Sequence, residues 1–212
     1  MRTYAAFVVL LALVVQWGCS RTILVPVPPR MDLKSYGTLG IIEFASNSDP
    51  AISNYATQQF QEHVQGAYPE TPILELGNRE TVLAAVGATQ FDADATTKIG
   101  KKYGVTAVFL GDLVYSEPKT DIRVTDIKRL EGGVRTEIRG DMSTKLMETQ
   151  SGASVWSSST WEKRQIGSVS LSTRRGVSAT VGDSNPRKDM VPALILHLTQ
   201  DFRPKLVRQR AP

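Results

Sequence analysis

Hydrophobic residues in the first half of the chain follow the spacing of alternating strands and helices. The runs TLGIIEF (38–44) and PILEL (72–76) are short and apolar, which is typical of buried strands. Between them, apolar residues recur every four positions after the pair Asp49–Pro50. This pattern predicts a helix that is capped by Asp49 and ends at Gly66.

Two shorter helices and a central strand follow. One helix begins near Asn78, and another runs from about Asp94 to Tyr103, where Gly104 provides the stop. The run VTAVFLGDLVY (105–115) is rich in β-branched and aromatic residues, and its first half is apolar on both faces. It is therefore predicted to lie in the middle of the sheet of an α/β layer.

The pattern changes to long strands after Pro118. Residues 134–147 alternate between apolar and polar, and the turn TQSGA leads into a second strand over 154–161. These segments predict a β-hairpin over 134–161. Residues 166–186 are rich in Ser, Gly and Thr, and two interpretations stay open for them, a loop or a weak second hairpin.

The last predicted element is an amphipathic helix that Asp189 would cap and that ends before Pro204. Its apolar face consists of Val191, Leu194, Ile195, Leu198 and Phe202. We therefore predict a single domain of the α/β class with α+β, sandwich-like layering over residues 38–202. It would contain a mixed β-sheet with flanking helices, a C-terminal β-hairpin and a final amphipathic helix, followed by a basic tail over 203–212.

The N-terminus has the features of an export signal. One basic residue precedes an apolar run over residues 5–15, and a small residue, Gly18, stands before the only cysteine of the chain, Cys19. Eleven apolar residues are too few for a transmembrane helix. We expect a signal peptide over 1–18. In an exported chain a lone cysteine pairs between chains, stays free or is modified.

The sequence around Cys19 resembles the lipobox of bacterial lipoproteins, although Gln16 stands where that family usually has leucine. The resemblance implies cleavage between Gly18 and Cys19 and acylation of Cys19, with palmitate among the expected chains. Ser20 implies the outer membrane, at its periplasmic face. The proline-rich segment that follows predicts a lipidated, extended tether over 19–37.

Positive charge is concentrated in the last quarter of the chain. Residues 163–212 hold ten Lys and Arg against three acids, whereas residues 19–162 hold fourteen against eighteen. The candidate contacts with a polyanion or a partner are Arg174, Arg175, Arg203, Lys205, Arg208 and Arg210. Anionic lipid head groups and cell-wall polymer are the expected ligands, and a solvated tail is the alternative. Export excludes nucleic acid as a partner.

Motifs for catalysis, metals or cofactors are not evident. His63 and His197 stand alone on predicted helices, and no pair of His or Cys has metal-ligand spacing. We therefore predict no catalytic residue, no metal site, no cofactor and no enzyme activity. An enzyme acting on envelope polymers would need scattered acids such as Glu43, Asp112 and Asp141 to converge.

Three stretches resemble a family of bacterial envelope proteins: TLGIIEFASN, PILELGNRETVLAAVG and DATTKIGKKYGVTAVFLGDLV. The family comprises the curli secretion lipoprotein CsgG, the amino-terminal domain of TolB and LpoB-like lipoproteins. Ile99–Gly100, Gly104–Val105 and Gly111 match its central pattern. A later run, DMSTKLMETQSGASVWSSS, resembles its hairpin. The resemblance implies the α/β domain already predicted, over most of the mature chain.

The predicted function is that of a non-enzymatic outer-membrane lipoprotein, a periplasm-facing binding or assembly module in envelope or appendage biogenesis. An envelope protein partner or self-assembly is expected. The alternative is a subunit of an oligomeric, curli-type secretion channel. Segment 119–133 carries too many charges to face lipid, and segment 164–185 offers only a thin apolar stripe. The sequence therefore favours the module over the channel.

Overall fold

The computed structural model describes residues 22–126, 131–172, 176–181 and 185–210. The chain divides into two compact units. One unit, here called the body, is Met31–Phe202. The other joins the two ends of the chain, Met1–Arg30 and Arg203–Pro212. The predicted signal peptide, Gly18, Cys19, Arg174 and Arg175 lie outside the described residues, so their roles stay predictions.

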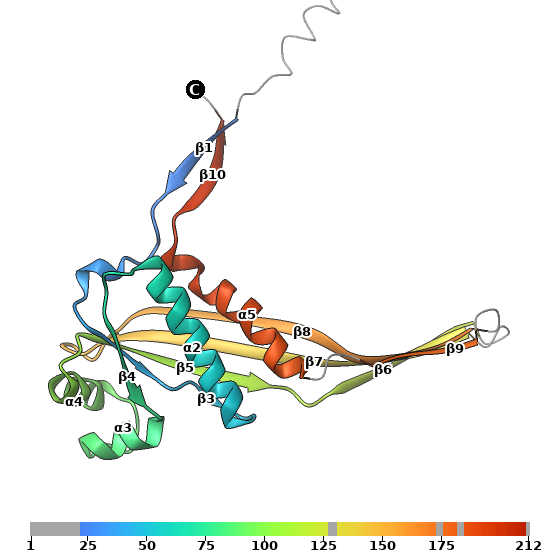
Figure 1. Ribbon diagram of the computed structural model, residues 1–212, viewed down its shortest axis with the longest axis horizontal. Coiled ribbons are helices and arrows are strands. Elements are labelled where there is room, and N and C mark those ends of the chain that lie inside the picture. Colours follow the sequence, from blue (N-terminus) through green and yellow to red (C-terminus); the bar gives the residue numbers. More distant parts are fainter. Residues whose placement is uncertain (1–21, 127–130, 173–175, 182–184, 211–212) are drawn as a thin grey trace, which may run out of the picture. The chain divides into compact units, whose positions relative to one another are not determined.

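The body is a mixed α/β layer, which confirms the predicted fold class (Figure 1). Its α-helices are α2 (Pro50–Ala67), α3 (Arg79–Val86), α4 (Ala93–Tyr103) and α5 (Pro186–Leu198), with 3-10 turns η1 (Leu33–Ser35) and η2 (Thr199–Phe202). Its strands are β2 (Leu39–Ile42), β3 (Ala45–Ser46), β4 (Ile73–Gly77), β5 (Ala107–Tyr115), β6 (Lys119–Asp126), β7 (Glu131–Glu148), β8 (Ser154–Ser172) and β9 (Gly176–Val181).

The strands of the body form one eight-stranded sheet with the main order β4-β2-β5-β7-β8-β9. Strands β4, β2 and β5 are parallel, and from β5 onward the pairing is antiparallel. Two strands lie off this path: β3 pairs with β5, and β6 pairs with β7. The position of β5 between β2 and β7 confirms the predicted central strand.

The predicted cap Asp49 is correct, α3 begins after Asn78 as predicted, and α4 begins after the cap Asp92, which lies two residues before the predicted start. Asp49 accepts a hydrogen bond from the backbone N–H of Ala51, and Asn78 accepts one from Thr81. The prediction that Asp189 caps the final helix is wrong. Asn185 is the cap and accepts from the N–H of Lys188 at 3.1 Å, so α5 begins earlier and Asp189 lies in its first turn.

Each face of the sheet has its own core. Helices α2 and α5 cover one face, where the largest group of buried side chains includes Phe60, Phe109, Leu146 and Phe202. Helices α3 and α4 cover part of the other face over a smaller cluster that includes Val82, Ile99, Val108, Leu110 and Met147. Alternation along β5 sends Val108 and Phe109 to opposite cores, which explains why its sequence is apolar on both faces.

The long strands extend further than the sequence predicts. The hairpin expected over 134–161 is present as part of a longer β7–β8 pair, with the turn near Gly152. Of the two interpretations of residues 166–186, the hairpin is correct, because β8 continues to Ser172 and β9 returns beside it. Strand β6 forms a further hairpin with the start of β7.

The two ends of the chain form a second, smaller sheet. Strand β1 (Thr22–Val27) pairs antiparallel with β10 (Lys205–Arg210), from Thr22 opposite Arg210 to Val27 opposite Lys205. The sequence predicts an unpaired tether and a basic tail at these positions and misses their pairing. It also misses Leu33, a tether residue that is fully buried in the core of the body.

Candidate functional site

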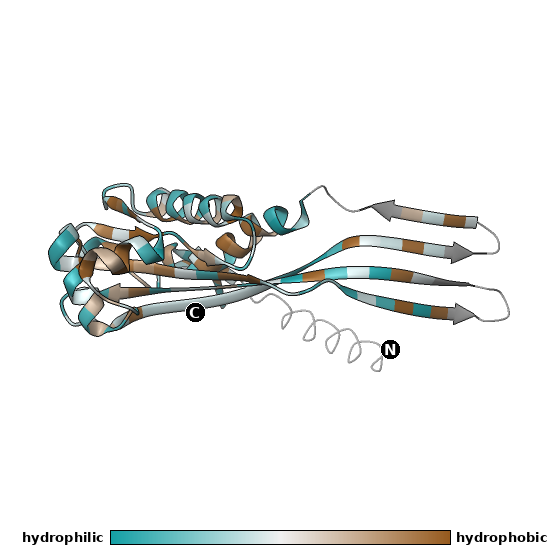
Figure 2. Ribbon diagram, turned by 90° about the horizontal axis from the view of Figure 1, so that it is seen from below, coloured by the Kyte–Doolittle hydropathy of each residue, from teal (hydrophilic) through white to brown (hydrophobic). Residues whose placement is uncertain are grey.

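The most distinctive feature of the body is a four-stranded extension of its sheet past the helices (Figures 1 and 2). We define the extension as β6, β9 and the segments of β7 and β8 that pair with them, 131–137 and 167–172. In Figure 2 its strands alternate between hydrophobic and hydrophilic residues. The pairing register decides how these residues are sorted between the two faces.

One face of the extension is apolar and continues the core-facing side of the sheet. Along β7, Ile138, Met142 and Leu146 point into the core, and Val134 lies on the same side because side chains alternate along a strand. Residues directly opposite each other in the ladder share a face, so Val134 stands with Ile122 and Val169. The described members of the apolar face are Thr120, Ile122, Val124, Val134, Thr136, Val169, Val177 and Ala179.

The apolar face is solvent-exposed in the isolated chain. The side chains of Ile122 and Val177 are each 69% exposed, and Val124 and Val169 are also exposed. Apolar side chains that are exposed together in a contiguous patch mark an interaction site. This face lies outside the helical layer that covers the same side of the sheet in the body.

The opposite face of the extension is polar. Its described members are Lys119, Asp121, Arg123, Arg135, Glu137, Ser168, Ser170 and Ser178. Asp121 and Arg123 form an ion pair at 3.0 Å, and the hydroxyls of Ser170 and Ser178 are 2.6 Å apart. All the charges in the described part of the extension whose side chains are placed therefore lie on one face.

A β-bulge brings the two halves of β8 into phase with β7. Thr136 is opposite Gly167 and Glu137 is opposite Gln165, so Ile166 is an extra residue in β8. Even-numbered residues of β8 face the core before the bulge, and odd-numbered residues continue the apolar face after it. The sequence interpretation of 164–185 sets Val169 and Leu171 against Ser168, Ser170 and Ser172, and the pairing likewise places Val169 on the apolar face and Ser168 and Ser170 on the polar face.

Trp161 marks the polar side of the sheet near the base of the extension. Its side chain is 53% exposed, and the guanidinium carbon of Arg139 lies 4.8 Å from the ring centroid. Arg139 also forms an ion pair with Asp141, which raises the pKa of Arg139. Trp161 and these two side chains border a recess of about 270 Å³ that also reaches Asp112.

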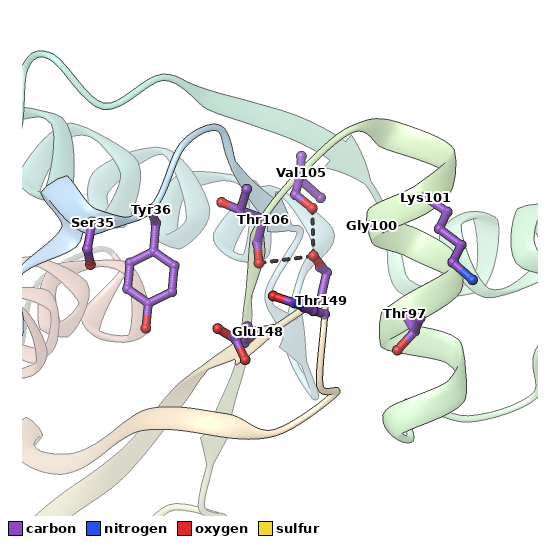
Figure 3. A pocket seen from close by; sticks show the side chains of 10 residues that line it. Ser35, Tyr36, Thr97, Gly100, Lys101, Val105, Thr106, Glu148 and Thr149 are labelled. Carbon is purple, nitrogen blue, oxygen red and sulfur yellow. Dashed lines mark hydrogen bonds between the residues drawn. The ribbon is translucent and has the colours of Figure 1, made fainter.

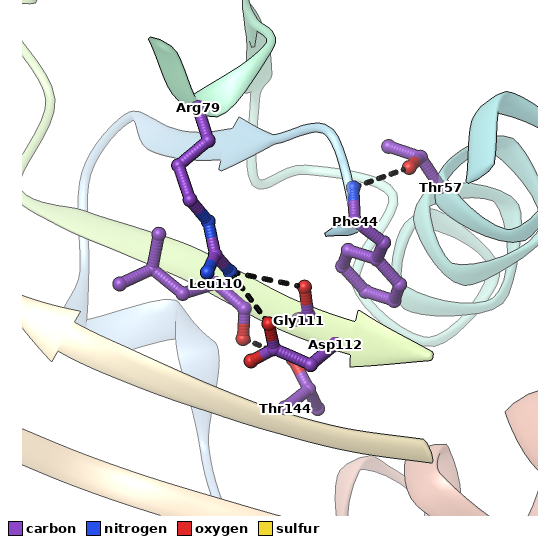
Figure 4. Close-up of polar contacts among 7 residues, drawn as sticks. All are labelled: Phe44, Thr57, Arg79, Leu110, Gly111, Asp112 and Thr144. Atoms are coloured by element: carbon purple, nitrogen blue, oxygen red, sulfur yellow. Dashed lines mark hydrogen bonds and ion pairs between the residues drawn. The ribbon is translucent and has the colours of Figure 1, made fainter. Parts of the chain in front are cut away.

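Of the three acids that an enzyme would need, Asp112 and Asp141 are paired with arginines, and Glu43 lies apart from them. Asp112 accepts from Arg79 at 2.9 Å, and the same guanidinium donates to the carbonyl of Gly111 at 3.4 Å (Figure 4). Glu43 lines a separate recess of about 460 Å³. Asp112 and Asp141 share one recess, but each has an arginine partner. These three residues therefore do not form the pair of unpartnered carboxylates that a glycosidase uses.

Around Gly111, close packing and hydrogen bonds hold β5 in place (Figure 4). The Thr144 hydroxyl donates to the carbonyl of Leu110 at 2.9 Å, and the Thr57 hydroxyl accepts from the backbone N–H of Phe44 at the same distance. These contacts join β7 and α2 to the parallel part of the sheet. Their effect is to hold these elements of the body together.

A wider recess of about 680 Å³ lies at the end of the body near the β7–β8 turn (Figure 3). Tyr36, Lys101 and Glu148 line it, and burial together with the charge of Glu148 raises the pKa of Tyr36. The Thr149 hydroxyl is turned inward and donates to the carbonyls of Val105 and Thr106, at 2.7 and 3.0 Å. The recess is open and its polar groups do not converge on one point.

The remaining residues that the sequence singles out lie at the C-terminal strand and on helices α2 and α5. Lys205, Arg208 and Arg210 are on β10, and Arg203 precedes that strand. His63 contacts the Thr199 hydroxyl at 3.2 Å, between α2 and the end of the last helix, whereas His197 is exposed and contacts Gln200 at 2.8 Å. Within the described ranges, no three His, Cys, Asp or Glu residues are grouped as a metal site would require. No helix among the described residues is long and apolar enough to cross a bilayer.

A scan against protein-family models finds no match, and neither does a search of curated proteins. Among solved structures, the PelC dodecamer from Paraburkholderia phytofirmans is similar, with 11% identity and a TM-score of 0.41 over 86% of this chain and 97% of that chain. The lipoprotein GNA1162 from Neisseria meningitidis has 11% identity and a TM-score of 0.39, over 76% and 96% of the two chains.

The LpoB C-terminal domain from Escherichia coli is also similar, with 12% identity and a TM-score of 0.36 over 62% of this chain and 87% of that domain. LpoB belongs to the group that the sequence resemblance names. At identities of 11 to 12% these similarities concern the fold alone. The chain thus has structural similarity to PelC, to GNA1162 and to the LpoB C-terminal domain.

Proposed function

We propose that this chain is a non-enzymatic, lipid-anchored protein of the outer membrane whose task is assembly. Several copies associate, and their extensions together line a passage through the membrane. The observation that supports this proposal is that, among the side chains placed in the described part of the extension, the charged ones lie on the face opposite the apolar ones. It reverses the order of preference that the sequence suggests, because the charges of β6 do not face the same side as its apolar residues.

The energetics favour lipid against the apolar face and water against the polar face. Each Val or Ile side chain removed from water contributes about 1.5–3 kcal/mol. An Arg or Lys facing lipid at mid-membrane costs about 2–4 kcal/mol, so Arg123 and Arg135 must face an aqueous space. Because both conditions are met by one orientation of the sheet, the extension is suited to the wall of a water-filled passage.

The described length of β6 covers most of the apolar band of an outer membrane. The eight residues of β6 span about 26 Å at about 3.3 Å each. An outer-membrane strand crosses an apolar band of about 25 Å at a tilt of roughly 40°. At that tilt a full crossing needs about 33 Å of strand, or about ten residues, so the described part of β6 accounts for about 20 Å of the band.

The edges of the extension call for further copies of the chain. In the described ladder β6 pairs with β7 and β9 pairs with β8, so each leaves one edge without a strand partner. Open strand edges are not tolerated in lipid. Since neighbouring strands alternate in direction, β9 of one copy and β6 of the next would continue the antiparallel order.

Alternating labels along β6 test the proposal. Cysteine would replace Asp121, Ile122, Arg123 and Val124 one at a time in the full-length lipoprotein, which would be labelled with an environment-sensitive maleimide and reconstituted into vesicles. We expect nitroxide lipids to quench labels at 122 and 124, and aqueous iodide to quench labels at 121 and 123. Fluorescence quenching measures this directly.

The unsubstituted chain is the matched control, because acylated Cys19 cannot react with the maleimide. Labelling of that chain would contradict the lipid anchor. If iodide reaches all four positions equally, the extension does not enter the membrane.

A second candidate function is a tethered periplasmic module whose apolar face binds another envelope protein. The observation that favours it is the shortness of β9, six residues against the roughly nine to eleven of a membrane strand. Uniform access of iodide together with a monomeric native mass would favour this module over the channel.

A further inference from the structure

The ribbon formed by the two ends of the chain has its own surface chemistry. Here the ribbon means β1 and β10 together with Arg203. Cross-strand pairing places Thr22 opposite Arg210, so the last residues of β10 lie beside the first residues of β1. Thr22 follows Cys19 by three residues, a distance of about 10 Å at most.

The ribbon exposes an unusual amount of apolar surface for its size. Leu206 is 68% exposed and Leu24 is 60% exposed, and Ile23, Val27 and Val207 are exposed as well. A two-stranded ribbon on its own is only marginally stable in water. We therefore expect the pairing of β1 with β10 to be stabilised when these side chains are buried against another surface.

All the charged residues of the ribbon are basic, and they lie on or beside β10. Residues 203–212 contain Arg203, Lys205, Arg208 and Arg210 and no acid, and β1 (TILVPV) has no charged residue. The first three of these basic side chains are exposed. The combination of exposed aliphatic and cationic side chains is that of segments that lie in the interface of an anionic membrane.

We infer that the ribbon is a second membrane contact, which lies on the anionic head groups of the leaflet that holds the lipid anchor. The inference rests on the proposed attachment at Cys19, since a chain held there keeps β1 within a few residues of the bilayer surface. Aliphatic residues of both strands enter the interface, and Arg203, Lys205 and Arg208 bind lipid phosphates. The C-terminus is thereby held at the membrane together with the N-terminus.

A label on the ribbon tests this inference. Val207→Cys in the full-length lipoprotein would carry the environment-sensitive dye, in vesicles of phosphatidylcholine alone or with phosphatidylglycerol, each containing a head-group nitroxide lipid. We expect strong quenching in the anionic vesicles, and weaker quenching in the neutral vesicles and at high salt. Each basic residue near an anionic surface should contribute about a fivefold factor to binding.

Charge reversal provides the matched comparison. The triple variant Arg203→Glu, Lys205→Glu, Arg208→Glu should remove the difference between the two vesicle types. The triple variant Lys34→Glu, Lys101→Glu, Lys145→Glu changes the net charge equally on exposed residues of the body and should keep that difference.

Two results would overturn the inference. Equal quenching in neutral and anionic vesicles would mean that the anchor alone brings the ribbon to the bilayer. Self-quenching between dyes without quenching by lipid would mean that a second copy covers the ribbon. Neither result depends on the labels along β6, so failure of the ribbon contact and failure of membrane insertion are distinguishable.

Discussion

Gly100 and Gly111 stand where two elements approach too closely for any side chain. A Cβ atom on Gly100 would lie 2.3 Å from the Cβ of Thr149, and one on Gly111 would lie 2.6 Å from the ring of Phe44. Both glycines belong to the pattern on which the sequence resemblance rests. That pattern therefore encodes the packing of α4 against the β7–β8 turn and of β5 beneath Phe44.

Replacement of Gly100 by alanine should destabilise the body. Thr149 cannot yield easily, because its hydroxyl is held by the carbonyls of Val105 and Thr106. Overpacking of this kind costs about 1–3 kcal/mol of unfolding free energy. Thermal or denaturant unfolding followed by circular dichroism would measure the loss.

Gly66→Ala is the comparison, since a Cβ atom there meets nothing within 4 Å in a helix of the same body. It should leave stability unchanged or raise it by up to about 1 kcal/mol. Equal losses in the two variants would show that close packing at Gly100 is not the cause.

Some residues that bond to near neighbours in the sequence were predictable, whereas residues that bond to distant partners were not. Asp49 and Asn78 cap helices through the next few backbone N–H groups, so the chain itself displays the signal. Asn185 was missed because Asp189 offers an equally good local signal four residues later. The pairing of Arg79 with Asp112 joins α3 to β5 and leaves no local trace.

At the scale of elements, the sorting of side chains in the extension depends on one extra residue. The bulge at Ile166 shifts the phase of β8 by one position, and a sequence pattern that is read without it mixes the two faces. For β6 the charges are frequent enough to suggest a soluble segment, yet alternation places Asp121 and Arg123 together on one side. Register, which is a property of paired strands, decides the character of each face.

Adjacent residues of β9 offer a sharp test of that sorting. Val177 belongs to the apolar face and Ser178 to the polar face. Val177→Asp should impair insertion into vesicles, because a carboxylate would then face lipid, whereas Ser178→Asp should be tolerated. Channel conductance in planar bilayers would measure the difference.

A similar loss in the two variants would argue against a lipid-facing side of the extension. No loss in either would assign the apolar face to a protein partner in the periplasm, where the second candidate function places it.

For the whole molecule, the decisive quantity is the number of copies in the native assembly. Open edges on β6 and β9 require partners once the extension enters lipid, so a closed ring is expected. The full-length protein extracted in a mild detergent should have a native mass many times that of one chain, measured by mass photometry or analytical ultracentrifugation. A harsh detergent should return it to the monomer, as the control for specific association.

A monomeric native mass in the mild detergent would contradict the channel and leave a tethered module. The same sample shows whether Cys19 carries acyl chains, through the intact mass of the protein.

The overall architecture was predictable where contacts are local and missed where they are remote. The order of strands and helices from residue 38 to residue 115 follows from periodicity, and the central place of β5 follows from its two apolar faces. The sequences of β1 and β10 each give only a weak indication of a strand. Each forms its strand by pairing with the other, at the opposite end of the sequence. Prolines next to β1 made an unstructured tether the natural expectation.

The pairing of Thr22 with Arg210 also sets an order of events in folding. A contact of such long sequence separation forms only after the last residues of the chain are available, whereas the hairpins and the body can close earlier. Closing so long a loop has a modest additional entropy cost once the body has brought the chain together. The ribbon is therefore expected to be the last part of the protein to form, and a chain that ends prematurely would fold its body without it.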